Sequence, residues 1–262
     1  MKKLIKLTIA LIFAFVLSGN AQDLNLDEIL AKHFETMNTE KLSKAESVQM
    51  YGKVMMQGME FPFSQLITQA GKIRTEAVIQ GSKMVRAFDG TDGWMVAPMM
   101  GTDEPQDMSP DEVDQMKDQS DLTGKLWNWK DKVQSLELIG KEDMEGTEVY
   151  KLKMVEKPKK NKTDTTEVKE ADVSFIYMDA ENFVILKTQL KKDIRGTEME
   201  FESYQSNYQD VDGVIFPFSM ETKMKGKTVN QISVDSVKFN VPVDDSMFTR
   251  PVKAEKKEDG EK

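Results

Sequence analysis

The sequence predicts a mainly β protein: a single curved antiparallel sheet, an unclosed half-barrel of about ten or eleven strands, covered by an N-terminal helix and a helical lid insertion. Three observations support this fold class. Short segments with partial apolar alternation, separated by turn residues, fill most of residues 47–239. No strand–helix–strand alternation occurs, which favours antiparallel pairing. One helical pattern precedes the strands and another interrupts them. A two-sheet sandwich is the alternative.

Residues 1–21 have the features of an export signal. Three lysines precede an apolar stretch, residues 7–17, that is too short to span a bilayer, and small residues lead to a cleavage site near Ala21. No later segment approaches the length of a transmembrane helix, so we expect a soluble exported protein without stable membrane insertion. The chain contains no cysteine, so we expect no disulfide and no lipid anchor at the mature N-terminus.

The charge balance is acidic. The whole chain carries −9, and the signal contributes three lysines and no acid, so the mature chain carries −12. Such a surface repels nucleic acid and anionic lipid head groups, which excludes nucleic-acid binding as a main role.

A helix is predicted at the start of the mature chain. Asn25 is suited to the N-cap position, and Glu28 completes a capping box. The helix ends near Asn38. Its apolar face consists of residues at helical spacing: Leu26, Ile29, Leu30, His33, Phe34 and Met37.

The first group of strands forms three hairpins. Gly58 and Gly81 are the turns of the first two, and Asp89-Gly90 with Asp92-Gly93 supplies the turn of the third, which spans residues 84–101. The flanks of this third hairpin are rich in Met, Val, Phe and Trp. The other predicted strands of the group are residues 48–56, 61–68, 72–80 and 83–88.

Residues 103–132 break the strand pattern and predict the helical lid insertion. Ser109 and Pro110 are suited to a helix N-cap and first position, and acidic residues follow in the first turn. A thin apolar stripe and a few large anchors complete it: Val113, Met116, Leu122, Leu126, Trp127 and Trp129.

Strands then resume in a second group, within a single domain expected over residues 22–252. Residues 157–170 are a charged loop, and residues 253–262 are a charged tail that we expect to be disordered. The predicted strands are residues 135–138, 147–155, 173–178, 184–191, 199–208, 214–224 and 228–239.

Little in the sequence suggests catalysis, so we expect no enzyme, no metal and no cofactor. The single histidine, His33, lies on the apolar face of the first helix, which favours a buried, hydrogen-bonded core residue. Residues 89–93 resemble a calcium loop only loosely, because the alternating ligands and the closing Glu are absent, and a hairpin turn is favoured. Methionine clusters without histidine partners argue against a copper site.

The excess of large apolar residues is the functional signal. A curved sheet would gather them into one concavity, where each buried methylene of a ligand is worth about 0.8 kcal/mol. A filled hydrophobic core is the alternative interpretation. The candidate ligand-binding residues are Met55, Phe61, Phe63, Leu66, Met84, Phe88, Trp94, Met99, Trp127, Phe175, Phe216 and Phe218.

Several motifs, in this order and spacing, resemble those of a known family. They are residues 88–98 (FDGTDGWMVAP), 146–152 (GTEVYKL), 175–179 (FIYMD), Tyr208 with 212–218 (DGVIFPF), and 244–248 (DDSMF). Together they resemble the LolA-type periplasmic outer-membrane lipoprotein carriers, in the broader LolA/LolB/RseB-like group, and most of all the longer versions in Bacteroidetes-like bacteria.

The resemblance implies a periplasmic half-barrel with a helical lid and an apolar interior for the acyl chains of a lipoprotein. It implies exchange with an inner-membrane release complex and an outer-membrane receptor. That receptor is itself a lipoprotein, a role that the missing cysteine argues against. The family's Arg-Pro, tied to lid closure, is absent near Gln69-Ala70, with no arginine before Arg74. The first hypothesis is therefore a carrier for an acylated lipoprotein or lipid; the alternative is an envelope sensor or scaffold that binds a protein partner.

Overall fold

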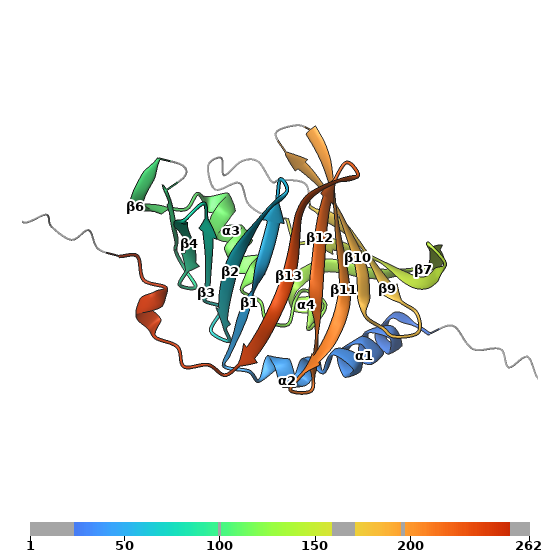
Figure 1. Ribbon diagram of the computed structural model, residues 1–262. Helices are drawn as coiled ribbons and strands as arrows, with labels where there is room; N and C mark the ends of the chain where they lie inside the picture. The colour runs from blue at the N-terminus through green and yellow to red at the C-terminus, as the bar shows by residue number, and fades with distance from the viewer. Residues whose placement is uncertain (1–23, 99–100, 159–170, 195–196, 252–262) are drawn as a thin grey trace, which may run out of the picture.

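Thirteen strands form one antiparallel sheet in the computed structural model, which describes residues 24–98, 101–158, 171–194 and 197–251 (Figure 1). The sheet does not close into a barrel, its strand order being β6-β5-β4-β3-β2-β1-β13-β12-β11-β10-β9-β8-β7. The predicted fold class is confirmed, the sandwich alternative is wrong, and the strand count exceeds the predicted ten or eleven. The strands are β1 (Ser47–Met56), β2 (Met59–Thr68), β3 (Ile73–Ile79), β4 (Ser82–Phe88), β5 (Gly93–Ala97), β6 (Thr102–Asp107), β7 (Val133–Met144), β8 (Thr147–Glu156), β9 (Val173–Asp179), β10 (Ile185–Ile194), β11 (Thr197–Val211), β12 (Val214–Met224) and β13 (Lys227–Phe239).

Pairing between β1 and β13 joins two meanders into this sheet, because every other pair of neighbours is consecutive in sequence. The register shifts by one residue between Tyr51 and Gly52. A Cβ on Gly52 would lie 2.2 Å from the backbone oxygen of Ser233. Glycine at this position therefore allows β13 to approach β1 at the seam between the halves.

The insertion between β6 and β7 must cross the whole molecule, because these two strands are the opposite edges of the sheet. Residues 103–107 were predicted as part of the helical insertion, but they pair with β5 as strand β6. Period-two apolar alternation is missing there, and polar side chains are tolerated because one side of an edge strand is unpaired. The insertion proper holds α3 (Pro110–Gln119) and α4 (Trp129–Lys132).

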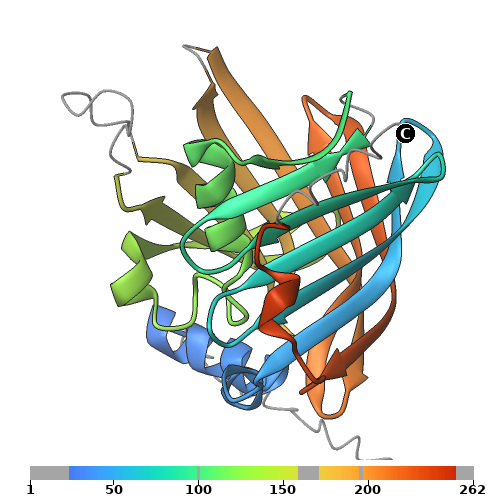
Figure 2. The same ribbon diagram turned by 90° about the vertical axis from the view of Figure 1, so that its left-hand side faces the viewer.

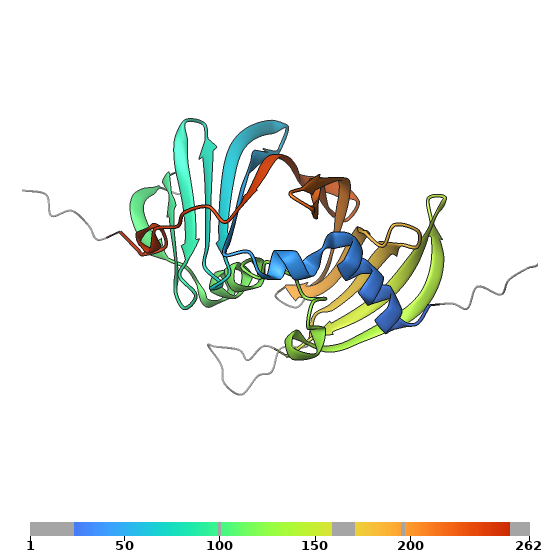
Figure 3. The same cartoon turned by 90° about the horizontal axis from the view of Figure 1, so that it is seen from below.

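Helix α1 (Leu26–Met37) has the predicted capping box. The amide of Glu28 donates to Asn25 Oδ1 at 3.1 Å, and Glu28 Oε2 accepts from the amide of Asn25 at 2.9 Å. The helix ends at Asn38, whose φ is 50° and whose side-chain amide donates to the carbonyl of Gly213 at 2.7 Å. Helix α2 (Thr39–Ser43) follows, and the two helices lie across one end of the curved sheet (Figure 3).

Both predicted apolar helix faces pack on the same side of the sheet. Ile29 and Leu30 of α1 lie in a buried cluster with residues of β7–β9 and with Leu126 of the insertion. Met116 of α3 is buried against Ile73 and Phe88 of the other half. The insertion thus begins on one half of the sheet and ends on the other.

The chain after β13 returns to the opposite side of the first half-sheet (Figure 2). This C-terminal segment, residues 240–251, contains the short 3-10 helix η2 (Asp245–Met247), and Phe248 after it is only 1% exposed. Among the described residues, no helix is long and apolar enough to cross a membrane. The predicted signal, the charged tail and nearly all of the charged loop (159–170) lie outside the described residues.

Candidate functional site

Strand register assigns each side chain to one of two faces. We call the face that carries α1, α3 and the insertion the concave face, and the other the convex face (Figure 3). Over the middle strands, the concave positions within residues 50–54, 216–224 and 230–239 carry no charged side chain. They are Met50, Gly52, Val54, Phe216, Phe218, Met220, Thr222, Met224, Asn230, Ile232, Val234, Val237 and Phe239.

The convex face of the same strands is charged. Lys53, Glu221 and Asp235 alternate there with serine and glutamine. A groove of about 230 Å³ lies on this side, lined by Lys53, Met55, Glu60, Tyr204, Ser206, Ser219, Glu221, Gln231, Ile232 and Ser233. Since adjacent residues of one strand differ this sharply, the two faces meet different surroundings.

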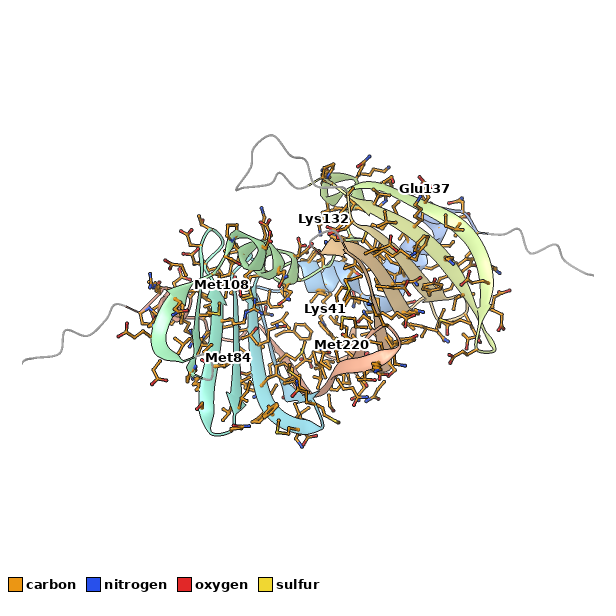
Figure 4. All side chains as sticks on the ribbon, turned by 90° about the horizontal axis from the view of Figure 1, so that it is seen from above. Lys41, Met84, Met108, Lys132, Glu137 and Met220 are labelled. Carbon is orange, nitrogen blue, oxygen red and sulfur yellow. The ribbon has the colours of Figure 1, made fainter. Side chains whose placement is uncertain are left out.

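The chain covers the concave face unequally. Helix α1 buries the part formed by β7–β9, and α3 buries the part formed by β3–β5. Between them, Met50, Phe63 and Met220 remain only partly buried. Met84 and Met220 lie on opposite sides of the space that the sheet curves around, viewed from its upper rim in Figure 4. The open concave surface is therefore apolar, partly exposed and flanked by covered cores.

Six of the twelve candidate residues lie on the concave face, although the structure does not test their role in binding. Phe63, Met84 and Phe216 are partly buried there, and Phe216 lies 5.7 Å from Phe239, ring centroid to centroid. The other three are almost enclosed: Phe61, Phe88 and Phe218, with 7%, 2% and 8% of their surface exposed.

Leu66 and Trp94 are on the convex face, contrary to the expectation of a shared cavity. Trp94 Nε1 donates to the carbonyl oxygen of Phe248 at 2.6 Å, and Arg74 Cζ lies 5.5 Å from the centroid of the indole ring. Both apolar side chains are buried, at 4% and 5% exposure, on the side where the C-terminal segment runs. Sequence spacing predicts that side chains alternate between the two faces. It does not predict that the C-terminal segment buries Leu66 and Trp94, because that segment lies far along the chain.

Three of the remaining four candidates lie away from the open concave surface. Met55 is convex and 40% exposed, and Phe175 is convex with Lys151 Nζ 5.3 Å from its ring centroid. Trp127 belongs to the insertion and packs edge-on against Phe34 of α1, with a centroid distance of 4.9 Å. Met99 lies outside the described residues.

Sequence reasoning missed several residues of the open concave surface. They include Met50, Met220 and Ile232, which lie in its middle and pack against the same buried cluster. The only signal in the sequence that could have identified them is the period-two pattern of their strands, which predicts two faces. Which of the two faces is concave depends on pairing between β1 and β13, residues almost two hundred positions apart.

His33 and Asp89 both have structural partners. His33 is 7% exposed, its Nδ1 lies 2.7 Å from the carbonyl oxygen of Phe183, and burial lowers its pKa below the usual value. This confirms the predicted buried, hydrogen-bonded histidine. Asp89 Oδ1 accepts from the amides of Thr91 and Asp92 at 2.8 Å, which confirms a hairpin turn. Within the described part of the chain, no group of three or more His, Asp or Glu side chains is arranged to hold a metal ion.

Arg74, the first arginine after the stretch where the family's Arg-Pro is missing, contacts the C-terminal segment. Arg74 is convex, its Nη2 lies 2.7 Å from Glu76 Oε1, and its Nη1 donates to the carbonyl oxygen of Met247 at 2.5 Å. It therefore holds the C-terminal segment and does not contact the concave face.

The fold of this chain is similar to that of several solved structures. No family model and no curated protein matches the sequence. Among solved structures, the chain is similar to a LolA superfamily protein from Nitrosomonas europaea, with a TM-score of 0.55 and 14% identity over 87% of this chain and 98% of that chain. It is also similar to a DUF1329 family protein from Desulfovibrio piger, with a TM-score of 0.54 and 12% identity over 84% of this chain and 97% of that one.

A third similar structure is a putative outer membrane lipoprotein-sorting protein domain from Vibrio parahaemolyticus, with a TM-score of 0.52 and 10% identity over 84% of this chain and 97% of that chain. At such identities the likeness concerns the fold. The chain has a LolA-like fold, as the motifs indicated, and its assignment to the Bacteroidetes-like version stays a prediction.

Proposed function

We propose that the protein is a soluble periplasmic carrier that shields the acyl chains of a lipid or lipoprotein on its concave face, in the sorting of outer-membrane lipoproteins. An inner-membrane release complex would supply the cargo and an outer-membrane receptor would accept it. The proposal includes no catalytic step.

One observation carries the proposal: an uncharged, apolar surface lies open on the concave side of strands whose convex side is charged. Exposed apolar area costs about 25 cal/mol per Å² relative to burial. An acyl chain laid against Met50, Met220 and Ile232 would remove that area from water. Similarity of fold to lipoprotein-sorting domains supports the same choice of ligand.

A second candidate function is a scaffold that binds a protein partner. It is favoured by three exposed methionines near the tip of the β1–β2 hairpin, Met55, Met56 and Met59, with 40%, 44% and 44% of their surface exposed. Methionine surfaces adapt to varied partners. Such a protein would not need an open apolar concave face.

Charged substitutions on the two faces test the carrier proposal. We expect Met220→Asp and Met84→Asp to weaken binding of decylpyrene, an apolar fluorescent probe, by more than about 100-fold, because a carboxylate would have to lose its water against the chain. Ser219→Asp is the matched control, since it is the neighbour of Met220 on the convex face. It should bind as the native protein does.

Circular dichroism and thermal unfolding establish that each variant is folded before its fluorescence titration is interpreted. Native mass spectrometry after purification from a bacterial periplasm gives a second readout, in which a co-purifying acylated species supports the carrier. Folded concave variants that bind the probe as tightly as Ser219→Asp would contradict it and favour the scaffold.

A further inference from the structure

A row of polar side chains crosses the open concave surface. Thr188 of β10 pairs with Ser203 of β11, Ser203 pairs with Thr222 of β12, and Thr222 pairs with Asn230 of β13. Directly paired residues of antiparallel strands point to the same side. We call these four residues the hydroxyl row; with a strand spacing of about 4.8 Å it is about 14 Å long.

The side chains of the hydroxyl row lack hydrogen-bond partners within the part of the chain that the structure describes. None of its four side chains makes a hydrogen bond to another described residue, and all four are partly buried. Among the described residues, no enclosed side-chain nitrogen or oxygen lacks a partner. The polar atoms of the row are therefore accessible from the concave side and available for hydrogen bonds.

Apolar side chains flank the row on both sides. Phe201 and Met224 pair next to it in one direction, and Met220 and Ile232 pair next to it in the other. Gln205, which pairs with Met220, already accepts a hydrogen bond from the Tyr208 hydroxyl at 2.9 Å. The row is thus a polar band between apolar residues, and none of these positions carries a charge. The next residue in register beyond Met224 on this side is Lys227 of β13.

We propose that the hydroxyl row binds the uncharged ester and hydroxyl groups of an acylated ligand, while the flanking apolar residues hold its chains. This inference rests on the proposed function and names a subsite within it. Hydroxyl groups both donate and accept, and the Asn230 amide does the same, so ester carbonyls and free hydroxyls of a glycerol ester all find partners. A carboxylate finds no opposite charge on the row and loses solvation there.

The test removes the hydroxyls without changing the shape of the surface. We compare Thr188→Val/Ser203→Ala/Thr222→Val with a control that removes three convex hydroxyls from β11, β12 and β13, Ser206→Ala/Ser219→Ala/Ser233→Ala. Two probes with similar chains are titrated by fluorescence: decylpyrene, which has no polar group, and the glycerol monoester of pyrenedecanoic acid.

The concave triple variant should bind the monoester about tenfold more weakly than the native protein, the loss expected for one or two hydrogen bonds. Its affinity for decylpyrene should stay within about twofold, and the convex control should match the native protein for both probes. Thr222→Val alone, with an expected loss of about threefold for the monoester, provides the same test if the triple variant unfolds.

The outcomes separate the two proposals. If the native protein binds neither probe, the carrier proposal fails and the subsite with it. If both probes bind the native protein and the concave variants lose no affinity for the monoester, or lose it equally for decylpyrene, the hydroxyl row is not a subsite and the carrier proposal stands.

Discussion

The convex face of the sheet is covered in one region and open in another. Over β2–β5 the C-terminal segment lies on it, and Trp94 and Phe248 are 5% and 1% exposed (Figure 2). Over β8–β12 lysines lie over aromatic rings of the convex face. Lys187 Nζ and Lys223 Nζ are 5.3 and 4.6 Å from the ring centroid of Tyr204. An aromatic side chain facing outward is thus either buried by the chain or bordered by cations.

The open concave surface follows neither pattern. Met50, Met220 and Ile232 are partly exposed, and the concave positions within residues 50–54, 216–224 and 230–239 carry no charge. The difference shows that exposure alone does not explain the composition of a surface. The convex surface is charged and the concave one apolar, which is the difference that the proposed carrier function requires. The predictions that follow test the covered and open regions in order of expected effect.

The largest effect is expected where the C-terminal segment is anchored. Phe248→Ala should lower the free energy of unfolding by about 3–5 kcal/mol, because it empties a fully buried aromatic site. Urea denaturation measures the change. Phe175→Ala, on the open convex region, is the matched control and should cost about 1 kcal/mol. Equal costs at the two positions would mean that the segment does not bury Phe248 in solution.

A smaller loss is expected at the hydrogen bond beneath that segment. Trp94→Phe removes the indole N–H that the carbonyl of Phe248 accepts at 2.6 Å. The cost should be about 2 kcal/mol, since an enclosed carbonyl loses its partner. Urea denaturation of Trp94→Phe, Phe248→Ala and the double variant tests whether the two residues act together. Additive losses would contradict a shared anchor.

Stability should depend on the protonation of His33, in the region covered by α1. Burial lowers the pKa of His33 in the folded state, so below pH 6.5 the unfolded chain binds a proton that the folded chain does not. The free energy of unfolding should therefore fall between pH 7.0 and pH 5.5, by up to about 1 kcal/mol, the limit for one histidine that stays neutral in the folded state. In His33→Leu this slope should disappear; an unchanged slope would assign it to other groups.

The smallest effect is expected on the open convex region. Lys223→Gln removes a cation near the Tyr204 ring and an ion pair with Glu221 of 3.6 Å, whose side chains are 30% and 27% exposed. Water screens such pairs, so the free energy of unfolding should change by about 0.5 kcal/mol. A loss above about 2 kcal/mol would show that this region is as tightly packed as the covered one.

The fold followed from the sequence because its signals are local. The capping boxes at Asn25 and Ser109 and the Asp-Gly turn at Asp89 form from residues three positions apart, and all three are present. Strand β6 was not recognised, because its residues 102–107 are polar and Pro-containing, which indicates a loop unless the pairing partner is known.

The candidate site followed only in part, because alternation gives two faces without saying which one curves inward. Phe63, Met84, Trp94 and Phe175 were all candidates for one cavity. In the structure, Phe63 and Met84 lie on the concave face, whereas Trp94 and Phe175 lie on the convex face. Trp94 has every local feature of a cavity residue, and what distinguishes it is Phe248, a residue 154 positions away. Local periodicity in the sequence does not predict such long-range contacts.

Photolabelling tests the concave-face account most directly. A palmitoyl glycerol monoester with a diazirine at the end of its chain would be irradiated with the folded protein, and the adducts mapped by peptide mass spectrometry. Adducts are expected on Met50, Phe63, Met84 or Met220, and excess unlabelled monoester should suppress them. Adducts confined to the convex groove, at Met55 or Tyr204, would contradict it.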